Sequence, residues 1–368
     1  MSTRPRVLLI GAAGVFGRRL AGHLARMGGI DLVCTSRSLA KAAALGLGTP
    51  CALDHRSGFS PALAALKPWL VIDASGPFQS AGYDVPRAAL EAGAHVLDLA
   101  DARGYLLGYG AALDDLARAK NLVALAGASS TPALSSAAAI ALTEGWRRVD
   151  RIDIAIAPGG RSEVGRAVIE AILSYAGRPV PEWRDGRLQT ATGWGVMRRV
   201  AMPGLGKRLV SPVETVDAEV LPGLLGVRER VTFSAGLESH VEQFGLVALA
   251  KLRAGGWIGT VRPLIPALLL LRRLTRLPAS DRGGMLVEAN GLDESGQAVT
   301  ARWSLLAEQG DGPHVPVLPA LAAARALLAG KLAPGARVCA AVLPLAAIER
   351  EMQPLAIATR RHVMPAPS

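Results

Sequence analysis

The sequence predicts an α/β fold in which a doubly wound parallel sheet is followed by a second, α+β domain. Three observations support this prediction. Short apolar segments alternate with Ala- and Leu-rich stretches from Arg6 to about Ala126, as successive strand–helix units require. After Gly127 the pattern changes, and the alternation from Asp150 to Ala157 is typical of an antiparallel strand. A length of 368 residues also exceeds the usual size of one core, so we expect two domains.

The first part of the chain contains six segments that qualify as strands covered on both faces. Each is short and apolar, and most are followed by a stretch of helical composition. Six parallel strands make a complete doubly wound sheet. The expected strands are Arg6–Ile10, Asp31–Thr35, Pro50–Asp54, Leu70–Ala74, Ala94–Asp98 and Leu122–Ala126, and the expected helices are Val15–Met27, Leu39–Ala44, Val85–Ala92 and Tyr109–Ala119.

The second domain is expected to combine further strands with helices. Strand-like residues occur at Ser211–Glu219 and at Val231–Ser234. Two more strands, Gly284–Gly291 and Ala298–Glu308, flank an Asp-Glu-Ser-Gly sequence whose composition suits a hairpin turn. An apolar helix follows at Pro319–Leu328. The expected domains are residues 1–148 and residues 149–312, followed by a C-terminal helical segment, residues 313–368.

A glycine-rich loop joins the first expected strand to the first expected helix. Gly11 permits a tight turn, Gly14 lets phosphate oxygens approach the main chain, and Gly17 allows the helix to pack closely on the strand. The backbone N–H groups of a helix N-terminus attract a pyrophosphate. The loop therefore predicts a Rossmann-type dinucleotide site, with a purely structural turn as the alternative. The loop residues expected to contact the cofactor are Gly11, Ala13, Gly14, Val15, Phe16 and Gly17.

The end of the second expected strand favours NADP over NAD. A site for NAD places Asp or Glu there to bind the ribose 2′-hydroxyl, but this chain has Ser36, Arg37 and Ser38. A guanidinium cannot accept that hydrogen bond, whereas it pairs well with a 2′-phosphate. Ser36, Ser38 and Lys41 add hydrogen-bond donors. We therefore expect Arg37 to select NADP; the alternative is that Arg37 only caps or solvates the loop.

Loops after the later strands are expected at the same edge of the sheet, because ligands bind at the carboxyl ends of parallel strands. Asp54 follows the third strand and could border the adenine. The loop after the fourth strand is small and leaves its backbone accessible. A structural turn is the alternative for each loop. The residues of these two loops expected to contact the cofactor are Asp54, Ser75, Gly76, Pro77 and Phe78.

Together these stretches resemble the saccharopine dehydrogenase-like (saccharopine reductase-type) oxidoreductases. That family carries an N-terminal glycine loop, a Gly-Pro-Phe loop after strand four and an acidic end of strand five. The segments that match here are Gly11–Gly17, Ser75–Phe78 with Gly82, Glu91–Ala100, Gly284–Asp293 and Ala320–Ala336. The resemblance implies an NADP-dependent oxidoreductase that transfers hydride to or from an imine, an amino-acid-derived compound or a carbonyl compound. It also implies that the C-terminal helical segment 313–368 packs back on the first domain.

Several residues are candidates for the group that moves a proton during hydride transfer. Members of the family commonly have Asp-x-x-Gly-Glu at the end of strand five, but here Asp98 and Asp101 occur without the Gly-Glu pair. This departure leaves the substrate open. A structural histidine is the alternative for His240, which comes from the second domain. The full set of candidates is Asp98, Asp101, Tyr83 and Tyr105 from strand-end loops, with Glu238 and His240 from the second domain.

Charge and cysteine content constrain the partners and the compartment. The 41 Lys and Arg residues outnumber the 30 Asp and Glu residues, but no run of five basic residues occurs, so nucleic acid is not an expected partner. Three widely spaced cysteines without ligand spacing predict a reducing, cytoplasmic location and no metal site. The apolar run at the N-terminus is too short for a signal peptide.

The most apolar segment, Trp257–Leu271, falls short of the ~20 residues needed to cross a bilayer. It contains Pro263 and Pro266. One interpretation is a buried helix or an oligomer surface, which would fit a homodimer; the other is a helix that lies on a membrane. We therefore expect a small-molecule substrate and a homo-oligomer. The alternative function is an NADP-binding sensor or membrane-associated partner protein without turnover.

Overall fold

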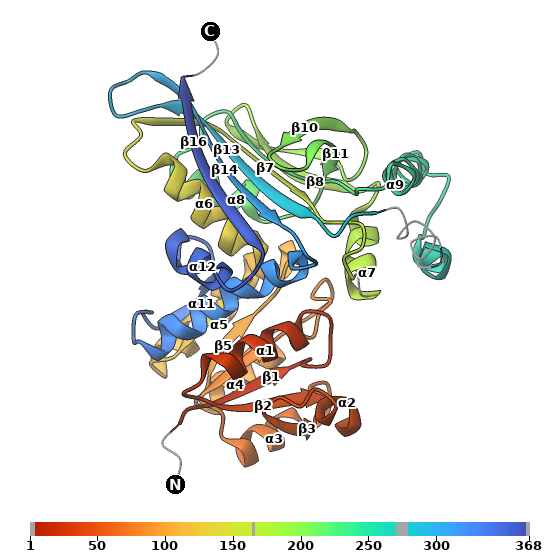
Figure 1. Cartoon of the computed structure of the whole chain (residues 1–368). Helices are drawn as coiled ribbons and strands as arrows, with labels where there is room; N and C mark the ends of the chain where they lie inside the picture. Colours follow the sequence, from red (N-terminus) through yellow and green to blue (C-terminus); the bar gives the residue numbers. More distant parts are fainter. Residues whose placement is uncertain (1–3, 164–165, 269, 271–278, 366–368) are drawn as a thin grey trace. The chain divides into compact units, whose positions relative to one another are not determined.

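The computed structural model describes residues 4–163, 166–268, 270 and 279–365 (Figure 1). The chain divides into two compact units. Unit 1 comprises Met1–Leu134 and His314–Leu343, and unit 2 comprises Ser135–Pro313 and Pro344–Ser368. The units therefore meet in sequence at 134, 313 and 343, rather than at the expected 148 and 312.

Unit 1 contains the predicted parallel sheet, with strand order β15-β6-β5-β4-β1-β2-β3 and parallel pairing throughout. The chain runs outward from β1 to β3 and then returns to β4 on the other side of β1, so the carboxyl ends of β1 and β4 form a topological switch point. The prediction of a doubly wound sheet is confirmed. The strands are β1 Arg6–Ile10, β2 Asp31–Ser36, β3 Thr49–Ala52, β4 Leu70–Asp73, β5 His95–Asp98, β6 Val123–Ala126 and β15 Gly335–Val338.

Apolar side chains cover the sheet of unit 1 on both faces. Leu70, Val71 and Ile72 of β4 are fully buried, as a strand between two helical layers requires. The segment His314–Leu343 closes the unit, and Nδ1 of His314 lies 2.8 Å from Nε2 of His23. The helices of unit 1 are α1 Gly17–Met27, α2 Leu39–Ala43, α3 Phe59–Leu66, α4 Asp84–Glu91, α5 Arg103–Ala119 and α11 Leu318–Leu328, with one turn of π-helix at Ser130–Leu134 and a 3₁₀ segment at Gly312–Val317.

Unit 2 is built on a mixed sheet with the path β10-β11-β12-β7-β13-β14-β16, to which β8 and β9 are added beside β12. The predicted α+β character and the hairpin between β13 and β14 are confirmed, since these strands form a continuous antiparallel ladder. The strands are β7 Arg148–Ala157, β8 Pro179–Arg184, β9 Arg187–Thr192, β10 Arg198–Met202, β11 Gly206–Pro212, β12 Arg230–Ala235, β13 Gly283–Leu292, β14 Ala298–Ala307 and β16 Ile357–Pro365.

Two expectations for unit 2 were wrong. The strand expected at Ser211–Glu219 ends at Pro212. The N–H of Val213 still donates to the carbonyl oxygen of Phe233 in β12 at 3.3 Å, and a helix then begins at Asp217. The final segment does not pack back on unit 1 as a whole, because β16 pairs with β14 along its full length. The helices of unit 2 are α6 Ser135–Thr143, α7 Arg166–Tyr175, α8 Asp217–Leu225, α9 His240–Ala254 and α12 Leu345–Met352, with a 3₁₀ turn at Arg262–Leu264.

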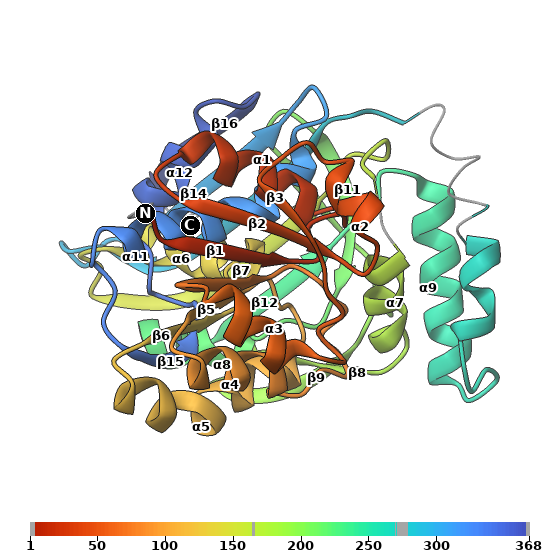
Figure 2. The ribbon, with the colours of Figure 1, turned by 90° about the horizontal axis from the view of Figure 1, so that it is seen from below.

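The apolar segment Trp257–Leu271 follows α9 in the chain. Figure 2 shows α9 at the edge of unit 2, with a second helical stretch beside it. Residues 269 and 271 lie outside the described residues. Trp257 is exposed, so the interpretation as a buried helix is wrong at this residue. Among the residues that the structure describes, no helix combines the length and the apolar character needed to cross a bilayer.

Candidate functional site

The loop between β1 and α1 has the backbone geometry that a pyrophosphate requires. Gly11 has a φ of 74°, and a Cβ on it would lie 2.8 Å from Cα of Ser75. A Cβ on Gly17 would lie 2.0 Å from the carbonyl oxygen of Gly11, so only glycine allows α1 to approach the loop this closely. The first turn of α1 carries no acidic residue, which preserves its attraction for an anion. The cradle therefore fits the predicted dinucleotide.

The other predicted members of the loop are placed where a ligand can reach them. Ala13, Val15 and Phe16 are all partly exposed, whereas Ala12 between Gly11 and Ala13 is buried. The N–H of Ala12 donates to the carbonyl oxygen of Thr35 at 3.0 Å, which holds the loop against the end of β2. The glycine loop and the end of β2 thus form one continuous edge of the sheet.

Arg37 stands exposed at that edge, and it forms no hydrogen bond or ion pair with the described part of the chain. Its neighbours shape the loop instead. Oγ of Ser36 accepts a hydrogen bond from the N–H of Ser38 at 3.3 Å, and Oγ of Ser38 caps α2 by accepting from the N–H of Lys41 at 3.4 Å. The side chain of Lys41 is exposed. The two hydroxyls therefore fix the turn, and the guanidinium remains available to an anionic ligand.

The loop after β4 is organised by Asp73, which the sequence analysis did not single out. Oδ1 of the buried Asp73 carboxyl accepts hydrogen bonds from the N–H of Ser75 at 2.8 Å and from its hydroxyl at 2.6 Å. Burial raises the pKa of Asp73, and the two bonds from Ser75 act in the opposite direction. The Gly76–Pro77 peptide is cis, and Phe78 is buried beside it. The sequence signal for Asp73 was a single acidic residue at the end of an apolar strand.

A cavity of about 440 Å³ opens beside this loop, within unit 1. Its size lies in the range of small-molecule sites. Ser75, Gly76, Pro77 and Phe78, which are predicted to contact the cofactor, all line it. After β3, His55 and Arg56 line the cavity. Asp54 is not among the lining residues, but its Oδ1 accepts a hydrogen bond from the N–H of Arg56 at 3.1 Å. The remaining lining includes Asp73 and Tyr105.

Asp98, at the end of β5, is a buried junction rather than a residue of the cavity wall. Its Oδ1 accepts the N–H groups of Ala100 at 3.0 Å and Gly127 at 2.8 Å, and its Oδ2 accepts the hydroxyl of Tyr105 at 3.1 Å. Burial raises the pKa of Asp98 to about 7, and the neighbouring Asp73 carboxyl adds to that increase. These bonds tie β5, α5 and β6 together.

The tyrosine candidates belong to an aromatic cluster around α5. The hydroxyl of Tyr83 donates to the carbonyl oxygen of Tyr105 at 2.9 Å, and the rings of Tyr83 and Tyr105 lie 5.1 Å apart. A Cβ on Gly108 would lie 2.4 Å from the Tyr83 hydroxyl, so glycine makes room for this ring on α5. Burial raises the pKa of both tyrosines. By contrast, Asp101 is exposed, and its Oδ1 accepts a hydrogen bond from the Gln79 amide at 3.3 Å.

The candidates from unit 2 have different surroundings. Oε2 of Glu238 accepts the N–H groups of Gly160 at 2.7 Å and Ser280 at 3.1 Å. Burial raises the pKa of Glu238, but the hydrogen bonds outweigh it and the net shift is downward. His240 is exposed at the first position of α9, with its ring 6.4 Å from that of Phe244. Glu238 therefore joins two loops of unit 2, while His240 is accessible.

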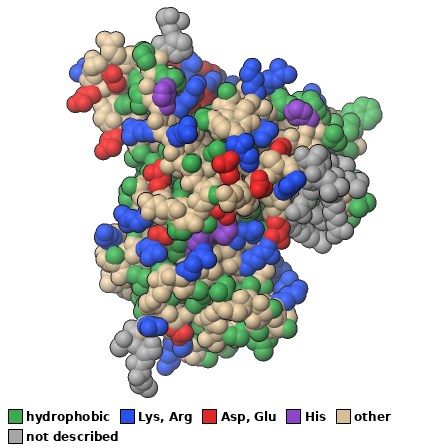
Figure 3. Space-filling view, in the orientation of Figure 1, with side chains coloured by type: hydrophobic (Ala, Val, Ile, Leu, Met, Phe, Trp, Pro, Cys, Tyr) green, Lys and Arg blue, Asp and Glu red, His purple; other side chains and the backbone are tan. Residues whose placement is uncertain are grey.

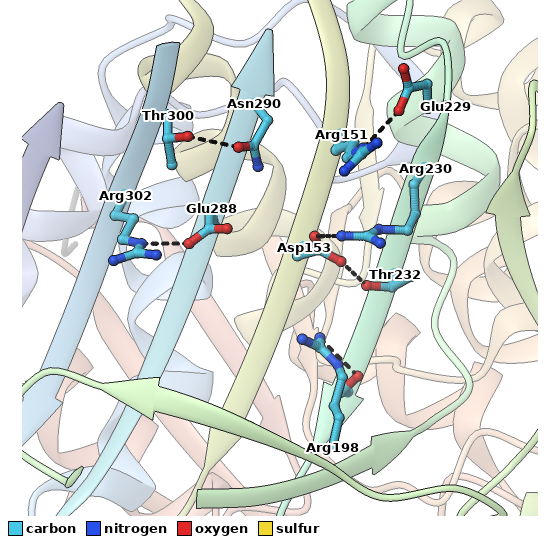
Figure 4. A network of polar contacts seen from close by, with 11 residues as sticks. Arg151, Asp153, Arg198, Glu229, Arg230, Thr232, Glu288, Asn290, Thr300 and Arg302 are labelled. Carbon is cyan, nitrogen blue, oxygen red and sulfur yellow. Dashed lines mark hydrogen bonds and ion pairs between the residues drawn. The ribbon is translucent and has the colours of Figure 1, made fainter. Parts of the chain in front are cut away.

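A second polar region covers part of the unit 2 sheet (Figure 4). Asp153 of β7 binds both Arg230 and Thr232 of β12, and Arg302 of β14 pairs with Glu288 of β13. The other pairs are Arg151–Glu229 at 2.6 Å, Thr300–Asn290 at 2.7 Å and Arg198–Ser234 at 3.3 Å. Charges of both signs alternate across these strands, so this face does not present a continuous basic surface.

In the described ranges, no group of three or more His, Cys, Asp or Glu side chains is placed so that it could hold a metal ion. Cys34 and Cys339 are buried free thiols, and Cys51 is a partly buried one. Burial raises the pKa of Cys34 to about 11 and that of Cys339 to about 12. Both buried thiols therefore stay protonated and unreactive at neutral pH.

Solved structures supply the comparison for this arrangement, since no family model and no curated protein sequence matches the chain. Saccharopine dehydrogenase (L-Glu forming) from Saccharomyces cerevisiae superimposes with a TM-score of 0.69 at 14% identity, covering 97% of this chain and 100% of that one. The chain has a saccharopine dehydrogenase-like fold. The resemblance found in the sequence is therefore confirmed at the level of fold.

Two further structures share the saccharopine dehydrogenase-like fold. Homospermidine synthase from Legionella pneumophila, in complex with NAD, has a TM-score of 0.62 at 12% identity, covering 99% of this chain and 92% of that one. DAP dehydrogenase from C. glutamicum, in complex with DAP, has a TM-score of 0.53 at 15% identity, covering 94% of this chain and 96% of that one. At these identities the likeness concerns the fold.

Proposed function

We propose that this protein is an NADP-dependent oxidoreductase that acts on an imine, an amino-acid-derived compound or a carbonyl compound. The observation that carries the proposal is the exposed Arg37, without a partner in the described chain, beside a glycine loop that fits a pyrophosphate. The fold supports it, because the similar structures include saccharopine dehydrogenase and DAP dehydrogenase. A bound nicotinamide supplies the hydride chemistry, and the chain supplies binding and orientation.

Different residues of unit 1 bind different parts of the dinucleotide. Backbone N–H groups at the start of α1 receive the pyrophosphate, because Gly11, Gly14 and Gly17 keep side chains out of the cradle. Arg37 pairs with the 2′-phosphate, and Lys41 adds a second positive charge nearby. The cavity beside Ser75–Phe78 receives the adjoining part of the dinucleotide.

For the proton-transfer group we favour Asp101 over the other candidates of unit 1. A general acid or base must reach the substrate, and the Asp101 carboxyl is exposed at the end of β5. Asp98 is buried and uses both oxygens in hydrogen bonds within the chain. The hydroxyl of Tyr83 is engaged by the carbonyl oxygen of Tyr105. His240 is the accessible candidate in unit 2. The proposal further includes a cytoplasmic, homodimeric protein that does not bind nucleic acid.

Thermal unfolding in the presence of NADPH, NADP, NADH and NAD tests the proposal. A ligand that binds only the folded state raises its stability, by about 2.7 kcal/mol at 100 times Kd. We expect NADP and NADPH to raise the melting temperature at concentrations where NAD and NADH do not. The Arg37→Asp variant should lose this selectivity, because its carboxylate repels the 2′-phosphate and accepts the ribose hydroxyl.

Arg199→Asp provides the control, because it makes the same charge change at an exposed arginine of β10 that forms no hydrogen bond or ion pair with the described part of the chain. It should retain the selectivity for NADP. If none of the four cofactors changes the melting temperature, the proposal that unit 1 binds a dinucleotide is wrong. If NAD and NADP stabilise the wild type equally, Arg37 does not select the cofactor.

A further inference from the structure

A stripe of apolar residues runs along the exposed face of α9. Val241, Phe244, Ala248 and Leu252 follow one another at intervals of three or four residues, so they share one face of the helix. All four are exposed, Val241 at 64%, Phe244 at 53% and Leu252 at 47% among the large ones. An unbroken apolar stripe on the solvent side of a helix marks an interaction surface.

The stripe does not arise from a loosely placed helix, because the opposite face of α9 is firmly packed. Gln243, Leu246, Val247 and Ala250 are buried there. The guanidinium of Arg253 donates to the carbonyl oxygens of Leu173 at 2.8 Å and Ala176 at 2.9 Å, at the end of α7. The helix is thus fixed on unit 2 by one face and presents a second apolar face outward.

The apolar surface continues beyond the helix. Trp257 follows α9 directly and is the most exposed large hydrophobic residue of the described chain, at 83%. Leu264 and Leu270 are exposed further along the same segment. In Figure 3 hydrophobic side chains gather on this edge of the molecule, at the right of the view. We call Val241, Phe244, Ala248, Leu252 and Trp257 the α9 stripe.

The segment that contains the stripe is strongly basic in sequence, although residues 269 and 271–278 of it lie outside the described residues. Residues 240–280 contain six Lys and Arg residues and one acidic residue, Glu242. Their net charge of about +5 is close to half of the +11 of the whole chain, although the segment is only about a ninth of its length. Lys251 is exposed on α9 itself, next to Leu252. A basic segment with an apolar helix face that carries Phe, Leu and Trp has the composition of segments that lie in a membrane interface.

We propose that the α9 stripe docks unit 2 on an anionic lipid bilayer surface, with Phe244, Leu252 and Trp257 inserted among the lipids. Anionic headgroups attract clustered Lys and Arg, so charge and apolar contact act together. A second copy of the chain fits less well, because two copies of this segment, each with a net charge of about +5 in sequence, repel each other. This inference is independent of the proposed NADP site, which lies in unit 1.

Sedimentation of the full chain with vesicles tests the docking. We expect binding to vesicles of phosphatidylcholine and phosphatidylglycerol, and little binding to pure phosphatidylcholine. The triple variant Phe244→Ser, Leu252→Ser, Trp257→Ser should partition at least about tenfold less, because it removes three inserted side chains. The control triple Leu188→Ser, Val196→Ser, Val363→Ser changes three exposed hydrophobic residues elsewhere on unit 2 and should bind as the wild type does.

Tryptophan fluorescence provides a measurement that does not depend on the folding of the triple variant. Trp257 is one of six tryptophans, so the difference between wild type and Trp257→Phe isolates its emission. We expect that emission to shift to the blue on anionic vesicles. The proposal is overturned if anionic vesicles neither bind the chain nor shift Trp257, or if both triple variants lose binding equally. The proposal is also overturned if the wild type is a dimer that binds no vesicles and the triple variant of the stripe is a monomer.

Discussion

At the end of β5, the buried carboxyl of Asp98 couples folding to pH. Burial raises its pKa to about 7 in the folded chain, whereas the pKa of an unfolded Asp is about 3.9. The folded state therefore binds the proton more tightly, and the contribution of Asp98 to stability is present at low pH and decreases as pH rises from about 4 to about 7. Asp98→Asn removes this decrease, because the amide stays neutral.

We expect the free energy of unfolding of the wild type, relative to Asp98→Asn, to fall by on the order of 1 kcal/mol per pH unit across that window. Denaturant unfolding at pH 5 and pH 8 measures it. Asp98→Ala is the matched control and should lose about 1–3 kcal/mol at both pH values, because the N–H groups of Ala100 and Gly127 lose their acceptor. A difference between wild type and Asp98→Asn that does not change with pH would contradict the assignment.

Residue identity singled out the exposed residues of the candidate site, but not the buried groups that hold its loops in place. Arg37 could be singled out because its charge is informative wherever the strand ends within a residue or two. Asp73 could not, because its role depends on the turn that brings the N–H and hydroxyl of Ser75 onto one carboxyl oxygen. The buried role of Asp98 likewise follows from contacts with Gly127, 29 positions away in the sequence.

At the scale of the element, α1 depends on the absence of one side chain. A Cβ at position 17 would lie 2.0 Å from the carbonyl oxygen of Gly11 and 2.8 Å from its carbonyl carbon, which are backbone atoms that cannot move aside cheaply. We expect Gly17→Ala to destabilise the chain by about 1–3 kcal/mol and to weaken NADPH binding. Urea unfolding and a fluorescence titration with NADPH measure the two effects.

The same helix offers a control of opposite sign. The nearest atom to a Cβ on Gly22 would be a guanidinium nitrogen of Arg26 at 4.0 Å, so alanine fits there. Gly22→Ala should stabilise α1 by about 0.5–1 kcal/mol, since alanine has the higher helix propensity, and should leave NADPH binding unchanged. Equal effects of the two variants would show that the loop tolerates a side chain at position 17.

The boundaries of helices and strands could be predicted where the local sequence pattern determines them. They could not be predicted where contacts with distant residues determine them. The helix expected at Tyr109–Ala119 begins at Arg103. Its first turns were missed because Gly104 and Gly108 weaken the helical signal in the sequence. Gly108 is nevertheless required there, since a side chain would clash with Tyr83. β15 was missed entirely. Its residues, Gly335–Val338, have little strand character and become a strand only through pairing with β6, more than 200 positions away.

At the scale of the whole molecule, the chain leaves unit 1 and returns to it, and then goes back to unit 2. The family resemblance implied that the whole C-terminal segment packs back on the first domain. The structure instead divides the segment at residue 343. Two buried residues fall on opposite sides of that division, Leu321 in α11 and Ile348 in α12.

Large-to-small substitutions at these two positions should therefore affect different units. Each should cost about 2–5 kcal/mol, because a buried Leu or Ile replaced by Ala leaves a cavity. Leu321→Ala should increase hydrogen exchange in β1, β5 and β6 and weaken NADPH binding, since α11 packs in unit 1. Ile348→Ala should increase exchange in β14 and β16 and leave NADPH affinity within about twofold of wild type, since α12 packs against α6 and β16. If both variants weakened NADPH binding and raised exchange in the parallel sheet alike, the segment would belong to unit 1 as a whole.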